Sequence, residues 1–211
     1  MLPTLVLLAC LAAFAYALLR DRPEGDAPRS LAKTASVALL ALAALAGDAP
    51  PAIAAGLALG AAGDWFLSRP GDRAFLSGMA AFGAGHLAYA GQFLAWGTGL
   101  PPLLPAGAFL LLALSTELWL APHAGALRGP VRGYIVLIAA MALAAMTVAG
   151  RPLAVLGAGL FVASDLLLAI ERFTPKGRAM AGIGLAVWVL YWTGQALILA
   201  GSLPQPLSLG P

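Results

Sequence analysis

Apolar residues gather into eight long segments that together make up most of the chain. Each segment is close to the roughly 20 residues that a helix needs to cross a hydrocarbon core of about 30 Å. The breaks between them, such as GDAPP, RPGDR and GTGLPP, contain the proline, glycine or charged residues that end helices. Strand-like alternation of polar and apolar positions is absent. We therefore predict helices over residues 2–19, 31–47, 51–68, 73–97, 101–121, 130–149, 152–171 and 178–202.

The composition indicates that these helices lie in lipid. Of the 211 residues, 61% are hydrophobic and 10% are charged, whereas a soluble domain carries about 25% charged residues. Because lipid offers no partner to backbone amides, a bundle of helices is the spanning structure that remains. We expect an all-α fold, a polytopic membrane bundle of about eight transmembrane helices that forms a single domain over residues 1–211.

The positions of the basic residues predict the orientation of the bundle. Of the 12 Lys and Arg residues, all but Arg151 lie in or beside the first, third, fifth and seventh breaks. Short loops rich in Lys and Arg stay in the cytoplasm. We therefore expect both termini on the non-cytoplasmic side of a membrane, the inner membrane if the host is a bacterium.

Charge and cysteine content exclude several classes of function. The net charge of +3 is spread over short loops, so nucleic acid is not an expected partner. The single cysteine, Cys10, excludes an internal disulfide and a cysteine-based metal site. The LLAC sequence that contains it is similar to a lipoprotein cleavage site, but no basic residue precedes it. Residues 2–19 are therefore interpreted as a retained first helix.

The two halves of the chain share an ordered pattern of polar residues. GDWFL and SDLLL both follow the pattern small-Asp-x-x-Leu, shortly before an arginine. Three pairs of positions match in order: Lys33 with Arg132, Asp64 with Asp165, and Gln92 with Gln195. We predict two four-helix repeats, about residues 1–100 and 101–205, related by an axis along the membrane normal. The alternative is chance similarity between helices rich in Ala and Leu.

Three carboxylates fall inside predicted spans: Asp64, Glu117 and Asp165. A carboxylate there costs about 2.5–3.5 kcal/mol on insertion, so it usually faces the bundle interior and marks function. The matched aspartates are the candidate catalytic pair, each roughly 7–10 Å from the cytoplasmic end of its helix. The alternative is that each carboxylate only pairs with a basic residue. Glu117, near Arg128, fits that structural role best.

Polar and aromatic residues share faces on two other spans. Phe82, His86, Tyr89 and Phe93 are spaced by four, three and four residues, which puts them on one side of a helix. Tyr191 and Gln195 share a side of the last span in the same way. These side chains are expected to support the carboxylates or contact a substrate.

A metal site and a nucleophilic serine are both disfavoured. His86 could complete a set of one histidine and two carboxylates, but a tight loop would offset it from Asp64 by roughly 13 Å. Ser164 precedes Asp165, so their side chains diverge by about 100° on a helix. Neither a Gly-x-Ser-x-Gly turn nor a phosphate-binding glycine loop is present. We expect no metal and no cofactor, and acid–base catalysis by carboxylates.

At these residues the sequence resembles the lysoplasmalogenase-like (YhhN-type) membrane family from about residue 30 to residue 202. The motifs that carry the resemblance are AAGDWFL, FLSGMAAFGAGHLAYAGQF, RGYIVLIAA, LFVASDLLLA and YWTGQALI. The resemblance adds Tyr134 and Lys33 to the candidate supporting residues, although Thr34 stands where the family pattern favours proline. It implies hydrolysis of the vinyl ether bond of lysoplasmalogens, which releases a fatty aldehyde and glycerophospho-ethanolamine or -choline.

That reaction suits the polar residues of the chain. Acid opens a vinyl ether by protonating the outer alkene carbon, and water then adds to the oxocarbenium ion. Two carboxyl groups that share a low-dielectric cavity lose their protons one at a time, which supplies one acid and one carboxylate. Glycosidases handle an analogous cation with such a pair. The expected partner is therefore a lysophospholipid with an ether-linked chain, drawn from the cytoplasmic leaflet, and the oligomeric state is left open.

Two other functions use intramembrane carboxylates. A proton-coupled transporter or lipid flippase would also suit parallel repeats. An intramembrane aspartyl protease uses two membrane aspartates, but Ala61 stands where its GxGD signature needs glycine, and its proline-alanine-leucine motif is absent. The hydrolase is the favoured function and the transporter is the alternative.

Overall fold

The computed structural model describes residues 1–173 and 182–204, which form an all-helical fold. Its helices are α1 (Leu2–Leu19), α2 (Ala27–Ala46), α3 (Pro51–Leu67), α4 (Asp72–Trp96), α5 (Leu103–Trp119), α6 (Arg128–Ala145), α7 (Pro152–Phe173) and α8 (Ile183–Ser202), with two short 3-10 turns, Ala121–His123 and Gly125–Leu127, between α5 and α6. The described residues contain no strand. All eight predicted helices are therefore confirmed.

Several helix boundaries differ from the sequence prediction by a few residues, and that of α2 has a local reason. Helix α2 starts four residues before the predicted position, because the Asp26 side chain accepts a hydrogen bond from the backbone N–H of Arg29 (2.9 Å) and caps the helix. Helix α7 continues to Phe173, past the predicted end. Residues 178–181 of the predicted eighth span, with Lys176 and Arg178, lie outside the described residues.

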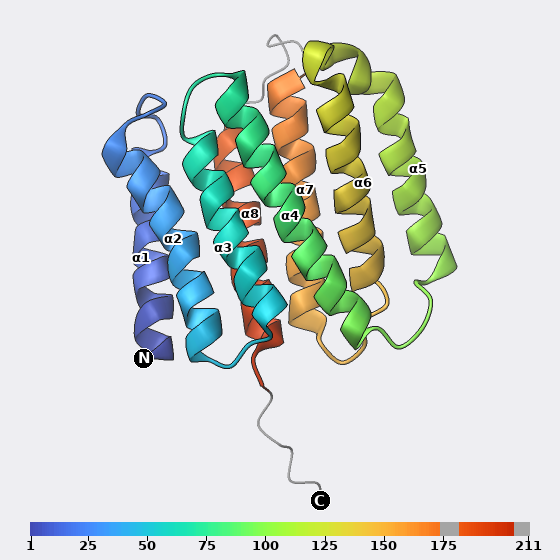
Figure 1. Ribbon diagram of the computed structural model, residues 1–211, viewed down its shortest axis with the longest axis horizontal. Helices are drawn as coiled ribbons and strands as arrows, with labels where there is room; N and C mark the ends of the chain where they lie inside the picture. The colour runs from blue at the N-terminus through green and yellow to red at the C-terminus, as the bar shows by residue number, and fades with distance from the viewer. Residues whose placement is uncertain (174–181, 205–211) are drawn as a thin grey trace, which may run out of the picture.

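The helices run side by side and change direction at each loop (Figure 1). Six of them, α1, α2, α5, α6, α7 and α8, are long and apolar enough to cross a membrane. Helix α3 is apolar but has 17 residues, and α4 has 25 residues but includes His86, Gln92 and four glycines. The chain is thus a polytopic helical membrane protein, with its two less typical helices packed against each other.

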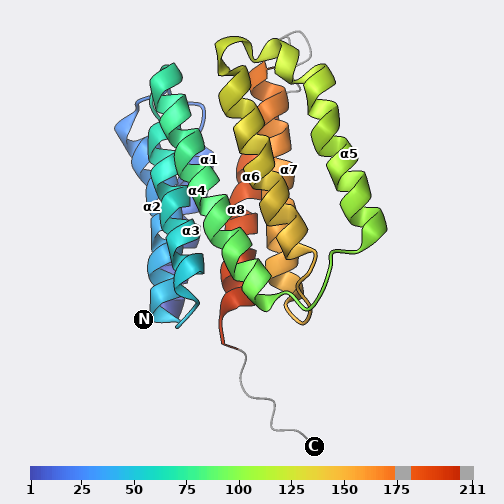
Figure 2. The same ribbon diagram turned by 45° about the vertical axis from the view of Figure 1, so that its right-hand side comes forward.

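Helix α5 stands apart from the other seven (Figures 1 and 2). Only two of its residues, Ala106 and Thr116, are buried. It exposes a series of large apolar side chains, which include Leu103, Leu104, Leu111, Leu114 and Leu118. In lipid this exposure carries little cost, because the surrounding acyl chains are as apolar as leucine.

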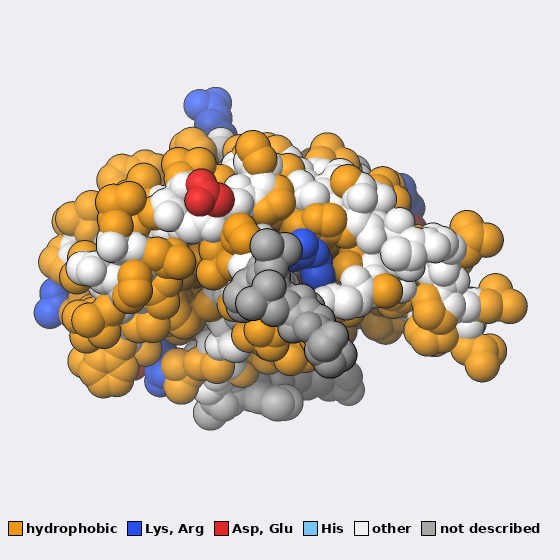
Figure 3. Space-filling view, turned by 90° about the horizontal axis from the view of Figure 1, so that it is seen from below, with side chains coloured by type: hydrophobic (Ala, Val, Ile, Leu, Met, Phe, Trp, Pro, Cys, Tyr) orange, Lys and Arg blue, Asp and Glu red, His pale blue; other side chains and the backbone are white. Residues whose placement is uncertain are grey.

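Helix α1 begins and α8 ends on the same face of the bundle (Figure 1). Seen from that face, hydrophobic side chains predominate and few charged side chains are visible (Figure 3). The charge pattern predicts that this face is non-cytoplasmic. A reporter fused after Pro211 should therefore read as non-cytoplasmic, and one inserted in the 21–29 loop as cytoplasmic. The opposite pair of signals would contradict the charge argument.

Helices α7 and α8 touch backbone to backbone. A Cβ added at Gly157 would lie 2.6 Å from the Gly194 carbonyl oxygen and 2.7 Å from the Ile198 backbone nitrogen. Small residues allow such close approach in membrane bundles. We expect Gly157→Leu to lower the free energy of unfolding by about 3 kcal/mol or more through overpacking.

The matched control for this substitution is Gly159→Leu. Gly159 lies on the same helix, and no atom lies within 4 Å of a Cβ added there. Thermal unfolding in detergent should therefore separate the two variants. Equal melting temperatures would mean that the α7–α8 contact does not require glycine at position 157.

Candidate active site

Asp64 lies near the end of α3 that the charge pattern predicts to face the cytoplasm, and it is completely buried. One carboxylate oxygen, Oδ1, lies 3.1 Å from the Lys33 ammonium of α2. The other, Oδ2, accepts a hydrogen bond from the Tyr191 hydroxyl of α8 at 2.8 Å. Three helices therefore meet at this carboxylate, and the ammonium compensates the charge that burial would otherwise disfavour.

Asp165 of α7 has partners of a different kind. Its Oδ2 lies 3.0 Å from His86 Nε2 and accepts a hydrogen bond from the Tyr134 hydroxyl at 3.2 Å. The second ring nitrogen of His86, Nδ1, lies 3.1 Å from the Met141 sulfur. Asp165 is thus held by an imidazole and a phenol, neither of which has the fixed positive charge that Lys33 brings to Asp64.

Tyr89 and Gln195 form a third buried polar contact. The Tyr89 hydroxyl donates to Gln195 Oε1 at 2.6 Å. The Gln195 amide nitrogen and the Tyr191 hydroxyl both lie against Gly60 of α3, where an added Cβ would come within 2.7 Å and 3.1 Å of them. Glycine at this position therefore makes room for the side chains that support Asp64. The predicted faces of α4 and α8 both point inward, as their burial confirms.

The two aspartates lie at different depths along their helices. Asp64 is three residues from the end of α3, whereas Asp165 is eight residues from the end of α7. At 1.5 Å per residue these separations are about 5 Å and about 12 Å. The sequence led us to expect roughly 7–10 Å for both, and the difference is larger because α3 ends at Leu67 while α7 continues at least to Phe173.

Both aspartates line one small central cavity of about 70 Å³. Its wall includes the Tyr191 and Lys33 partners of Asp64, and Phe82 of α4. Ser164 also lies on this wall, but its hydroxyl donates to the backbone oxygen of Val187 (3.0 Å), so it contributes to the contact between α7 and α8. The cavity brings the two carboxylates to a common space in which a small group could lie between them.

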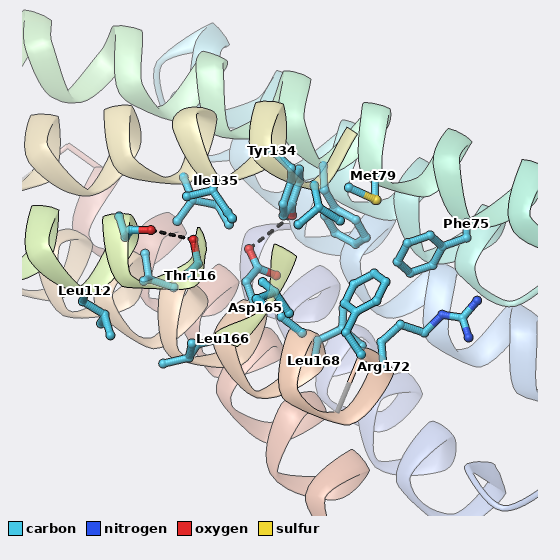
Figure 4. Close-up of a pocket in the computed structure, with 18 of the residues that line it drawn as sticks. Phe75, Met79, Leu112, Thr116, Tyr134, Ile135, Asp165, Leu166, Leu168 and Arg172 are labelled. Atoms are coloured by element: carbon cyan, nitrogen blue, oxygen red, sulfur yellow. Dashed lines mark hydrogen bonds between the residues drawn. The ribbon is translucent and has the colours of Figure 1, made fainter. Parts of the chain in front are cut away.

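A second cavity, of about 110 Å³, leads from Asp165 towards α5 (Figure 4). Its wall is almost entirely apolar and is shared by α4, α5, α6 and α7. Figure 4 shows the Asp165 carboxylate among Met79, Leu112, Ile135 and Leu166. This side cavity suits a hydrocarbon chain, and its α5 wall was not anticipated from the sequence because most of the α5 residues that line it are apolar.

A third cavity, of about 850 Å³, opens at the end of the bundle where α1 and α3 end. Charged residues of both signs line this vestibule: Arg20, Asp21, Glu24, Arg29, Lys33, Arg69, Glu171 and Arg172. The vestibule shares Tyr16 and Lys33 with the central cavity, and the central cavity shares Phe82 and Asp165 with the side cavity. The vestibule also shares Phe75 and Arg172 with the side cavity, and Leu67 and Leu168 line all three. The three cavities therefore meet around these two leucines, with the charged residues at the mouth and the apolar wall towards α5.

Glu117 lies apart from this site. Its carboxylate accepts two hydrogen bonds from Arg132, at 2.6 Å and 2.5 Å, and lies 3.8 Å from Arg128, in an exposed position. This agrees with the structural role favoured for Glu117. The match of Arg132 with Lys33 does not extend to function, because Arg132 binds Glu117 whereas Lys33 binds an intramembrane aspartate.

Among the described residues, no group of three His, Cys, Asp or Glu side chains could hold a metal ion. His86 contacts Asp165 and is not grouped with Asp64 as a metal ligand set. Sequence reasoning missed Tyr16 and Trp188, whose rings lie 4.3 Å apart beside Lys33, and Met141 behind His86. Apolar or aromatic residues in an apolar span give no signal that separates them from ordinary packing.

The sequence model of the YhhN family matches residues 28–202 of the chain. The chain belongs to the YhhN family. Both aspartates and their partners Lys33, His86, Tyr134 and Tyr191 lie within the matched region, whereas Tyr16 of α1 lies before it. No curated protein and no solved structure matches the chain.

Proposed function

We propose that this YhhN family member is a lysoplasmalogenase-type ether hydrolase. It would cleave the vinyl ether bond of a lysoplasmalogen drawn from the cytoplasmic leaflet, in bacteria that of the inner membrane. One observation carries this proposal: the cavity with both aspartates shares wall residues with both an apolar cavity and a charged vestibule. A lysoplasmalogen has matching parts, since its vinyl ether joins a hydrocarbon chain to a polar head group.

The charges of the vestibule are suited to binding a zwitterionic head group. Arg29 and Arg69 lie on its wall with Lys33, and Glu24 and Glu171 lie on the same wall. Guanidinium and ammonium groups bind phosphate oxygens, while carboxylates bind an amine. Glycerophospho-ethanolamine and glycerophospho-choline carry both charges, so either one fits the charges of this mouth.

The side cavity is suited to binding a single flexible hydrocarbon chain. It is too small to enclose a whole alkenyl chain, and α5 leaves its outer side next to lipid. Moving a hydrocarbon chain from lipid to an apolar wall changes its surroundings little. This cavity therefore positions the chain but adds little to the binding affinity of the lipid. The chain would hold the vinyl ether next to Asp165.

The test is aldehyde release from lysoplasmalogen by the purified protein in detergent. The matched control lipid has the same chain and head group but a saturated ether, which acid does not open. We expect aldehyde from the vinyl ether only, with one deuteron on the aldehyde α-carbon when the reaction runs in heavy water. Intact lipid at every pH, together with movement of that lipid across reconstituted vesicles, would instead support a transporter.

A further inference from the structure

The two aspartates meet different parts of the cavity system. Asp165 lies on the walls of both the apolar side cavity and the central cavity. Asp64 lies on the wall of the central cavity, and its partner Lys33 reaches the charged vestibule. Asp64 is also nearer than Asp165 to the end of its helix at the vestibule. An amphiphile that places its chain in the side cavity and its head group in the vestibule therefore passes the two carboxylates in one orientation. Its chain side lies towards Asp165 and its head-group side lies towards Asp64.

This direction decides which atom of a vinyl ether meets which carboxylate. In the unit chain–CH=CH–O–glycerol, the outer alkene carbon is on the chain side and the ether oxygen is on the head-group side. The outer carbon therefore lies towards Asp165, and the carbon bonded to oxygen lies towards Asp64. Protonation occurs at the outer carbon, and positive charge then develops on the carbon bonded to oxygen.

The partners of the two carboxylates agree with this direction. The Lys33 ammonium, 3.1 Å from Asp64, stabilises a negative charge there. Asp165 faces His86 Nε2, which can accept a hydrogen bond from a protonated carboxyl while Nδ1–H points at the weakly accepting Met141 sulfur. The site thus accommodates a carboxylate at position 64 and a carboxylic acid at position 165.

We propose that Asp165 is the acid that protonates the alkene carbon, and that Asp64 is the carboxylate that stabilises the oxocarbenium ion and activates water. This assignment rests on the proposed function. The Asp165 proton forms the new C–H bond and leaves a carboxylate. Water then bonds to the cationic carbon, and its proton passes to Asp64, which gives a neutral hemiacetal.

The same two groups complete the turnover. Asp165 takes the hemiacetal hydroxyl proton as the C=O bond of the aldehyde forms and the C–O bond to glycerol breaks. Asp64 returns its proton to the glycerol oxygen. One vinyl ether and one water become one aldehyde and one alcohol, and both side chains regain their starting forms.

The test uses a non-cleavable lipid with the same chain and head group, in which a secondary ammonium replaces the ether oxygen. It mimics the charge of the oxocarbenium ion, and its affinity is compared with that of the neutral saturated ether. We expect Asp64→Asn to reduce the preference for the cationic lipid at least tenfold, and Asp165→Asn to change it less than threefold. The control is Asp48→Asn, in the opposite loop, where the residue has φ 54° and asparagine is well tolerated.

A second measurement covers the case in which the asparagine variants fail to fold, and it reports on turnover. Small carboxylic acids should restore aldehyde release by Asp165→Ala, and the rescue should grow as pH falls because the protonated acid is needed. Formate should rescue Asp64→Ala with the opposite pH trend. Reversed trends, or loss of the cationic preference in Asp165→Asn alone, would overturn the assignment. A wild-type protein that releases no aldehyde from lysoplasmalogen would instead refute the proposed function.

Discussion

Replacing either Asp64 or Asp165 by asparagine is expected to lower kcat for aldehyde release at least about 100-fold, the usual contribution of a general acid or base. Asparagine has the shape of aspartate but neither donates an acidic proton nor holds a negative charge. Both variants should insert in the membrane, because an amide can still accept from Tyr191 or Tyr134. Asp165→Asn should unfold like the wild type, whereas Asp64→Asn leaves the Lys33 ammonium without its partner and should unfold at a lower temperature. Kinetics on lysoplasmalogen with a thermal unfolding scan would measure both properties.

The comparison variant is again Asp48→Asn, which makes the same chemical change on the opposite face and should keep wild-type kinetics. If Asp64→Asn or Asp165→Asn keeps more than about a tenth of the wild-type kcat, that aspartate is structural. Smaller losses of kcat are expected for changes at the supporting residues Tyr89 and Gln195. Tyr89 donates to Gln195, and Gln195 lies against Gly60 beside Tyr191, so both act on Asp64 indirectly.

Lys33→Met is expected to lower the free energy of unfolding by about 3 kcal/mol, because breaking a buried ion pair leaves one charge without its partner. The double variant Lys33→Met/Asp64→Asn should recover most of that loss, since no unpaired charge remains. Melting temperatures of the wild type, both single variants and the double variant form a cycle that isolates the coupling between the two side chains.

The comparison for this cycle is Arg22→Met, which removes an exposed ion pair with Asp26 at 3.6 Å. Such pairs contribute about 0–1 kcal/mol, so the melting temperature should change little. Additive losses in the Lys33 and Asp64 variants would contradict the ion pair as the stabilising contact. Lys33 would then have to act in the vestibule alone.

Much of the membrane architecture follows from local features of the sequence. Hydropathy over about 20 residues marks a span because lipid forces each segment to satisfy its own backbone hydrogen bonds. The inward faces of α4 and α8 follow from the 3.6-residue period, as the burial of His86, Tyr89 and Gln195 confirms. Helix ends were less certain, because a single capping contact, such as that of Asp26, moves a boundary by several residues.

The partners of the two aspartates could not be read from the sequence, because they depend on packing between distant helices. Asp64 and Tyr191 are 127 residues apart, and Asp165 and His86 are 79 apart. Sequence showed that Lys33 and Arg132 start matching spans, but only packing decided that the first turns inward to Asp64 and the second outward to Glu117. No local periodicity contains this choice.

By itself, the sequence determined the helices, their lipid environment, the inward faces and the two aspartates as candidate groups, since each depends on neighbours within a few turns. Only the tertiary structure decided the chemical difference between the aspartates and the place where the three cavities meet. A cavity exists where side chains from several helices fail to meet. The side cavity, for example, exists because α5 stands away from α6 and α7. That property belongs to the arrangement of helices in space and to no single segment of the chain.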